Sequence, residues 1–449
     1  MWTSSSAAGL LALAAVVSAG AQVPSAGDVA PPTYSFSDSN TPLPYHHGGK
    51  WPLAVSTSND NSTAGIPPSQ DPWYSAPAGY EHAKPGQVLK IRNATALAST
   101  IANASEAYHI LYRTTSGDYK AAWAVTTLLV PFANITTSRD KLLSYHIPYD
   151  SADVDASPSY TLYSGGGYGG DAAITEALGR GYIVSTPDYE GPGAFFTAGV
   201  FSGHATLDSV RAVRSKKSPV QLAEGHRYAT WGYSGGALAG EWAAELQVQY
   251  APELKFEGHA LGGLTPNITS VLYTINGTVY AGLAPAGIVG ILSQYPDTQA
   301  YLLANLNPSG PYNATRFLQT KNFTLLESIA QFVGQNIFLY FQNGEGTVQS
   351  RFAMNVVNRD GVMGYHGVPA PPLFVYKAIG DDVSPVHDTD ILVERYCRVG
   401  ATIDYQRNTV GTHQTESTNG DARAVAFLEK LFSGTYKAEG CTITNVTIG

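Results

Sequence analysis

A serine lies among glycines at residues 232–236, where the sequence reads Gly-Tyr-Ser-Gly-Gly. In a chain with 46 glycines one G-x-S-x-G match carries little weight alone, but its context adds to it. An apolar segment of strand length, 227–231, precedes the motif, and an Ala-rich helical pattern, 237–250, follows it. Such an elbow exposes the serine hydroxyl beside a helix N-terminus, whose free N–H groups favour a developing oxyanion. We therefore predict Ser234 as the nucleophile of an acyl transfer.

A serine hydroxyl needs a base to take its proton, and imidazole has a suitable pKa. In a strand–elbow–helix fold the order along the chain is serine, acid, histidine. His413 follows a strand-like segment at 401–406 and precedes the final helical segment around 423–432, and no histidine comes after it. We predict His413 as the general base and keep His387 as its rival.

The orienting acid should follow the strand predicted at 373–378, because the carboxyl end of that strand lies beside the elbow. Asp381 and Asp382 both occupy this loop, and either carboxylate can hold an imidazole tautomer. We favour Asp381 and leave Asp382 open. The acid that is not used is expected to cap a helix or to face solvent.

The oxyanion needs two donors, of which the backbone N–H of Gly235 is one. The second must come from an earlier loop, and two loops compete for it. Asp150 follows a predicted strand at 142–148, while residues 164–171 form a glycine-rich run. The pattern does not decide between them.

The elements around these residues predict an α/β fold of the α/β-hydrolase type, with a mostly parallel central sheet flanked by helices. Apolar runs of strand length alternate with helical stretches from about residue 121 onward. We divide the chain into a signal peptide (1–21), an extended N-terminal arm (22–72), the first part of the core (73–264), an inserted helical cap (265–367) and the C-terminal part of the core (368–449).

Composition favours a large core and a weakly charged surface, with 44% hydrophobic and 14% charged residues. The net charge of −9 includes no basic block, so nucleic acid is excluded as a partner and a neutral or apolar substrate is expected. We expect a monomer.

The N-terminus indicates secretion. An apolar stretch at 7–17 is followed by a small-x-small site at 19–21, and no later run of about 20 apolar residues predicts a membrane span. In an oxidising compartment the only two cysteines, Cys397 and Cys441, should pair. Asn-x-Ser/Thr sequons suit an extracellular glycoprotein, and they occur at Asn61, Asn93, Asn103, Asn134, Asn267, Asn276, Asn313, Asn322 and Asn445.

Taken together, these motifs resemble the fungal secretory lipase family, of the lipase A type. The resemblance runs over most of the mature chain and is most specific at 71–74, 85–89, 232–236, 250–254, 380–385 and 412–416. It implies that Asp381 takes the triad role and that Asp150 gives the second oxyanion N–H. It also implies a helical cap, a Cys397–Cys441 disulfide and no metal or organic cofactor.

We accordingly expect a triacylglycerol lipase, with transient contact to a lipid interface. The alternatives are an esterase that deacylates a small secreted metabolite and, from another class, a non-catalytic binding protein on the same fold. Peptidase activity has no positive support. Two departures from the family pattern, Tyr149 before Asp150 and the long glycine run, affect the expected size of the substrate.

Overall fold

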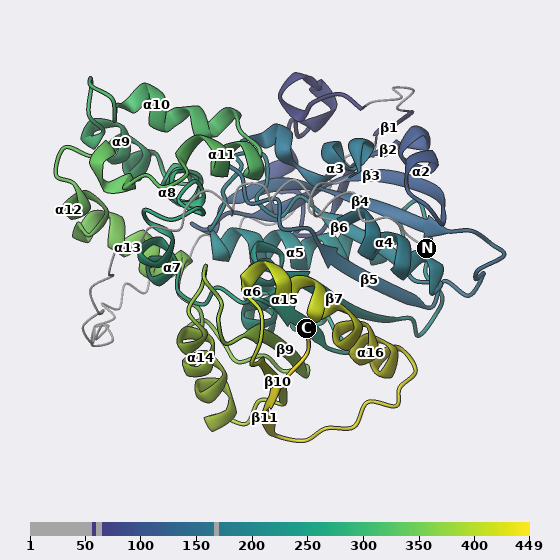
Figure 1. Ribbon diagram of the computed structural model, residues 1–449. Helices are drawn as coiled ribbons and strands as arrows, with labels where there is room; N and C mark the ends of the chain where they lie inside the picture. The colour runs from purple at the N-terminus through teal and green to yellow at the C-terminus, as the bar shows by residue number, and fades with distance from the viewer. Residues whose placement is uncertain (1–55, 60–64, 166–169) are drawn as a thin grey trace, which may run out of the picture. The chain divides into compact units, whose positions relative to one another are not determined.

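The central feature is one mixed β-sheet, seen in the computed structural model, which describes residues 56–59, 65–165 and 170–449 (Figure 1). Within these residues the sheet has eleven strands in the order β1-β2-β3-β4-β6-β5-β7-β8-β9-β10-β11. The strands are β1 (Ser56–Asn59), β2 (Val88–Asn93), β3 (Ala104–Thr115), β4 (Ala121–Pro131), β5 (Lys141–His146), β6 (Ile183–Pro187), β7 (Arg227–Tyr233), β8 (His259–Gly262), β9 (Leu373–Ala378), β10 (Ile403–Asn408) and β11 (Cys441–Val446).

In the half of the sheet that runs β6-β5-β7-β8-β9-β10-β11, every pairing is parallel. The pairings of β2 with β3, β3 with β4 and β4 with β6 are antiparallel. The parallel part places the carboxyl ends of β5, β7 and β9 at one edge, where α/β proteins bind ligands. The fold class inferred from sequence is confirmed.

The α-helices of the described residues are, in chain order, α2 (Thr95–Thr100), α3 (Pro158–Thr161), α4 (Gly170–Gly179), α5 (Gly199–Arg214), α6 (Gly235–Tyr250), α7 (Ile268–Ile275), α8 (Leu283–Ser293), α9 (Pro296–Asn305), α10 (Ala314–Leu318), α11 (Leu325–Phe332), α12 (Glu345–Val348), α13 (Arg351–Asp360), α14 (Val386–Arg398), α15 (His413–Asn419) and α16 (Asp421–Phe432).

Helices cover both faces of the sheet, because side chains alternate between them along each strand. In β5, Leu142 packs in the cluster that contains α5 and α6, while Leu143 packs in the cluster that contains α4 and α16. The same alternation holds for Leu373 and Phe374 in β9. The parallel strands therefore read as continuous apolar runs, as the sequence pattern indicated.

Helices α7 to α13, drawn in green, form a layer of their own beside the sheet (Figure 1). They share an apolar core built around α8. An isolated bridge between Asn267 and Val362 joins the two ends of this insertion. On the return to β9, the backbone N–H of Gly364 donates to the buried Glu245 carboxylate on α6 (2.7 Å). The insertion is thus tied directly to the helix that follows Ser234.

At the other edge of the sheet, a disulfide joins Cys397, at the end of α14, to Cys441, at the start of β11. The pairing expected from the sequence is therefore present. β11 adds parallel to β10 and its side chains are largely exposed.

Some expectations fall outside the described residues, namely the leader at 1–21, most of the N-terminal arm (22–55 and 60–64), Asn61 and the middle of the glycine run at 166–169. Among the residues that are described, no helix is long and apolar enough to cross a membrane.

Candidate active site

Ser234 occupies a strained turn between β7 and α6. Its φ of 52° and ψ of −121° lie in a region that non-glycine residues rarely adopt, at a cost of about 1–3 kcal/mol. The Ser234 N–H donates to the Gly262 carbonyl on β8 (2.9 Å), which helps to hold the turn. A Cβ on Gly232 would overlap the backbone of Gly236, and a Cβ on Gly236 would overlap the His146 carbonyl. The glycines are therefore required by close backbone approach.

His413 begins α15 and lies between Ser234 and Asp381. Its Nε2 is 2.8 Å from Ser234 Oγ, and its Nδ1 is 2.8 Å from Asp381 Oδ2. With Nδ1 protonated toward the carboxylate, Nε2 is free to accept the serine proton. The Tyr233 hydroxyl donates to the His413 carbonyl and fixes the start of this helix.

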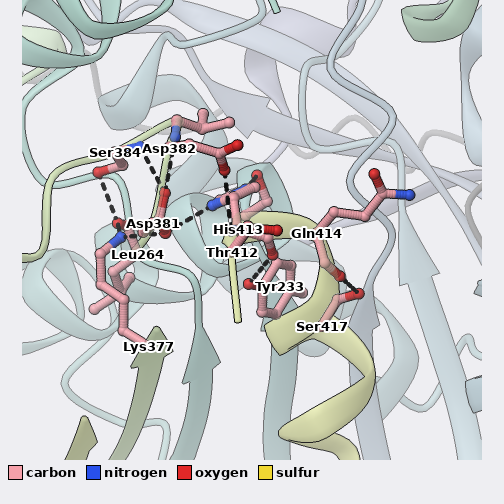
Figure 2. Close-up of polar contacts among 12 residues, drawn as sticks. Tyr233, Leu264, Lys377, Asp381, Asp382, Ser384, Thr412, His413, Gln414 and Ser417 are labelled. Atoms are coloured by element: carbon pink, nitrogen blue, oxygen red, sulfur yellow. Dashed lines mark hydrogen bonds and ion pairs between the residues drawn. The ribbon is translucent and has the colours of Figure 1, made fainter. Parts of the chain in front are cut away.

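Asp381 is held as a carboxylate by four donors (Figure 2). Its Oδ1 accepts from the N–H groups of Val383 (3.0 Å) and Ser384 (2.8 Å), and its Oδ2 accepts from Lys377 Nζ (2.8 Å) as well as from His413. Burial alone would raise the pKa of Asp381, but the positive charges and hydrogen bonds of His413 and Lys377 bring it well below its usual range. The acid therefore stays ionised across the neutral pH range.

Asp382 and His387, the alternatives considered from the sequence for the acid and the base, have other contacts in the structure. Asp382 Oδ1 accepts from the backbone N–H of His413 (3.2 Å), so it caps α15. His387 lies in the first turn of α14, next to Asp388, and among the described residues it makes no hydrogen bond to Ser234.

The loop after β5 brings Asp150 against the elbow. Asp150 is buried with a φ of 41°, and a Cβ on Gly235 would overlap its Oδ1. Gly235 is the first residue of α6, so its N–H has no acceptor within the helix. Both residues line the same cavity as Ser234. Of the two competing loops, the described part of the glycine run does not line it.

Two tyrosines brace this loop, and the sequence analysis did not assign them a role. Tyr149 Oη accepts from the backbone N–H of Glu190 (2.6 Å), and Tyr189 Oη donates to the carbonyl of Ile147 (2.7 Å). Lys377 was missed as well. A lone lysine in an otherwise apolar strand, four residues before an acid, is the signal that could have identified it.

A cavity extends from Ser234 into the insertion. Its walls are mainly apolar side chains of the loop before α5 and of α7, α8 and α13, among them Phe196, Ile268, Leu272, Ile288, Ile291 and Val357. Thr269, Tyr273 and Gln349 add a few polar groups. The arrangement suits an apolar ligand with one carbonyl placed at the serine.

A parallel sheet with an elbow serine, a histidine and a carboxylate in this order defines an α/β-hydrolase. Residues 170–440 match the model of the family described as Secretory lipase. The chain is 49% identical to a protein named Trichothecene C-3 esterase from Fusarium sporotrichioides, over 88% of this chain and 92% of that one. It is 34% identical to Lipase A from Arthroderma benhamiae, over 85% and 83% of the two chains.

Among solved structures, the fold is similar to Candida antarctica lipase A in its closed state, with a TM-score of 0.77 and 27% identity over 86% of this chain and 91% of that one. The chain belongs to the secretory lipase family. It is a carboxylic ester hydrolase.

Proposed function

We propose that the protein cleaves apolar carboxylic esters through an acyl-enzyme on Ser234. His413 removes the Ser234 proton, Ser234 Oγ attacks the ester carbonyl, and the N–H groups of Asp150 and Gly235 hold the oxyanion. His413 then returns its proton to the leaving alcohol. Water, activated by His413 in the same way, releases the acid and restores the serine.

Asp381 is the orienting carboxylate in this proposal. It fixes the Nδ1-protonated tautomer of His413 and stabilises the imidazolium that forms during attack. The observation that carries the proposal is the chain of 2.8 Å contacts from Ser234 Oγ through both ring nitrogens of His413 to Asp381, which ends at an apolar cavity.

For the substrate we favour an ester of a compact apolar alcohol. The cavity beside Ser234 has mainly apolar walls with a few polar groups, as in sites that bind small apolar ligands. The relative that shares 49% identity is named a trichothecene esterase, which supports deacylation of a small metabolite. Triacylglycerol lipase activity is the second candidate, favoured by the apolar walls and by the likeness to Candida antarctica lipase A.

We further propose that the protein is secreted as a monomer after removal of residues 1–21, and that residues 265–367 act as a cap over the site. The family name supports secretion. Among the sequons within the described residues, exposed asparagines suited to glycan attachment are Asn93, Asn134, Asn322 and Asn445.

A direct test compares the purified protein with Ser234→Ala and with Ser417→Ala, a control on the same helix as His413. The substrates are p-nitrophenyl esters from acetate to palmitate, an acetylated polycyclic terpenoid alcohol and emulsified triolein. We expect Ser234→Ala alone to lose hydrolysis and labelling by a fluorophosphonate. Preference for the acetylated alcohol supports the esterase, and preference for triolein supports the lipase. Unchanged hydrolysis in Ser234→Ala would rule out the mechanism.

A further inference from the structure

Glu416 lies about one turn after His413 on α15, and the mechanism above gives it no role. Its side chain is fully buried, although a glutamate is rarely buried completely unless it is paired. His413 is the first residue of this short helix, so its imidazole meets Ser234 only where α15 holds it. The contacts of Glu416 therefore bear on the position of the general base.

The Glu416 carboxylate joins α15 to the end of β10 and to the start of α16. Its Oε2 accepts from Nδ2 of Asn408, the last residue of β10 (2.6 Å). Its Oε1 accepts from the guanidinium of Arg423 on α16. Glu416 and Asn408 are both fully buried, so moving the carboxylate away from its donors would leave a charge and a polar group unpaired.

The amide of Asn408 is itself fixed in one orientation. Its Oδ1 accepts from the N–H of Ile448 (3.0 Å), and its Nδ2 donates to the carbonyl of the same residue (2.6 Å). Because an amide has one acceptor and one donor end, these two contacts turn Nδ2 toward Glu416. Asn408 is therefore a rigid attachment point for α15.

The first turn of α15 is held at His413 itself (Figure 2). The His413 N–H donates to Asp382 (3.2 Å), and Tyr233 Oη donates to the His413 carbonyl. A helix held only at its first residue can pivot about that residue and carry the imidazole with it. Glu416 adds an attachment one turn further on, which fixes the direction of the helix.

We propose that Glu416 is a positioning residue, which holds α15 so that His413 Nε2 stays within hydrogen-bond distance of Ser234 Oγ. The inference rests on the proposed function. Among the described residues, none of α15 lines the cavity, so Glu416 acts through the helix and leaves substrate binding unchanged. Its loss should therefore appear in kcat and not in KM.

The test is steady-state hydrolysis of p-nitrophenyl butyrate at pH 8 by wild type and Glu416→Gln. The amide keeps the size of the side chain but turns an NH₂ group toward Asn408 or Arg423, which are themselves donors. Asp208→Asn is the matched control on α5, because Asp208 is also fully buried and pairs with an arginine, Arg211 (2.8 Å). Both substitutions should lower the free energy of unfolding.

We expect Glu416→Gln to lose about 100-fold in kcat, the usual effect of a small misplacement of a catalytic group, with KM within roughly twofold. Asp208→Asn should keep both constants within roughly threefold of wild type. Equal losses of kcat in the two variants, an unchanged kcat in Glu416→Gln, or a loss that appears only in KM would overturn the proposal.

A variant that leaves the ion pair intact covers the case in which Glu416→Gln does not fold. Asn408→Ala removes the attachment to β10 but keeps Arg423 beside Glu416. Its kcat should fall about tenfold at constant KM, because one of the two anchors remains. A wild-type kcat in folded Asn408→Ala would overturn the proposal.

A second readout does not depend on activity. The proton between His413 Nδ1 and Asp381 should give a downfield ¹H NMR resonance, which Glu416→Gln should shift or broaden and Asp208→Asn should not. An unchanged resonance in Glu416→Gln would overturn the positioning role. Wild-type hydrolysis no faster than that of Ser234→Ala would instead contradict the proposed function, while the resonance still decides whether Glu416 positions His413.

Discussion

Two carboxyl groups flank the Ser234 region, and the protein surrounds them in opposite ways. Asp381 receives hydrogen bonds from two backbone N–H groups, Lys377 and His413, and is ionised. Asp150 is buried beside Glu190 and forms no ion pair within the described part of the chain, and burial raises its pKa to about 7. The comparison shows that the surroundings, and not the residue type, determine the charge of an aspartate.

The two charge states suit the two charges that acyl transfer creates. In the proposed mechanism the imidazolium of His413 forms on the Asp381 side, where a carboxylate stabilises it. In the proposed mechanism the oxyanion forms on the Gly235 side, where a charged Asp150 carboxylate would repel it. Each prediction below alters one side of this pair.

The largest effect is expected from Asp381→Asn. The amide keeps the shape of the side chain but cannot stabilise the imidazolium or select the tautomer of His413, so kcat should fall by about 10⁴-fold. Steady-state kinetics at pH 8 would measure it. The control is Asp382→Asn, which weakens only the cap of α15 and should keep kcat within roughly threefold. Similar losses of kcat in both variants would contradict the assignment of the orienting role to Asp381 and not to Asp382.

Lys377→Met tests the cation that keeps Asp381 ionised. Lys377 is fully buried, and its removal takes away the ammonium group that donates to Asp381 Oδ2. Unfolding free energy should drop by about 3–5 kcal/mol, the usual result of breaking a buried pair.

In Lys377→Met the pKa of Asp381 should also rise toward its normal range. The loss of kcat should then be larger at pH 5 than at pH 8. Lys430→Met, at an exposed position of α16, serves as control. A loss of kcat that is equal at both pH values would contradict this role of Lys377.

The sequence identified the elements around Ser234 well because buried parallel strands and the elbow have local signatures. The strand predicted at 373–378 is β9 (Leu373–Ala378), and 227–231 lies within β7 (Arg227–Tyr233). The sequence also predicts a short amphipathic helix at 207–214, which is only the second half of α5 (Gly199–Arg214). Nearly all of α5 is buried, so its first half lacks the one-sided apolar pattern that predicts a surface helix.

Other features depend on contacts far apart in the chain. β2 and β3 were not predicted, because buried polar residues interrupt their pattern: Arg92 pairs with Asp71 and contacts His109 Nδ1 at 3.1 Å. The choice between Asp381 and Asp382 depends on the direction in which one turn points each carboxyl. The raised pKa of Asp150 results from burial by segments far apart in the chain, which no local sequence motif predicts.

Asp150→Asn should also change how stability depends on pH. The ordinary pKa of this carboxyl is 3.8, and in the folded protein it is about 7, so the folded state holds a proton that the unfolded chain has lost. This contribution to unfolding free energy declines as the pH rises from about 4 to 7. At about 1.4 kcal/mol per pH unit, wild type should lose roughly 2 kcal/mol relative to Asp150→Asn between pH 5.5 and 7.

Urea unfolding of both proteins at the two pH values would measure this difference. The sign is opposite to that of Asp381, whose lowered pKa contributes stability that is lost on acidification. A gap between wild type and Asp150→Asn that stays constant with pH would show that Asp150 is ionised throughout, and the contrast between the two acids would disappear.

The smallest effect is expected from Tyr149→Phe, which leaves both carboxyls in place and loosens only the loop that carries Asp150. In the wild type the Tyr149 hydroxyl accepts from the Glu190 N–H at 2.6 Å. The substitution removes this acceptor and leaves the buried N–H without it. We expect kcat to fall about tenfold with KM within twofold, because an oxyanion donor acts mainly in the transition state. Tyr145→Phe, on β5, should not reproduce the effect. A rise in KM at constant kcat would instead assign Tyr149 to substrate binding and leave the Asp150 loop rigid without it.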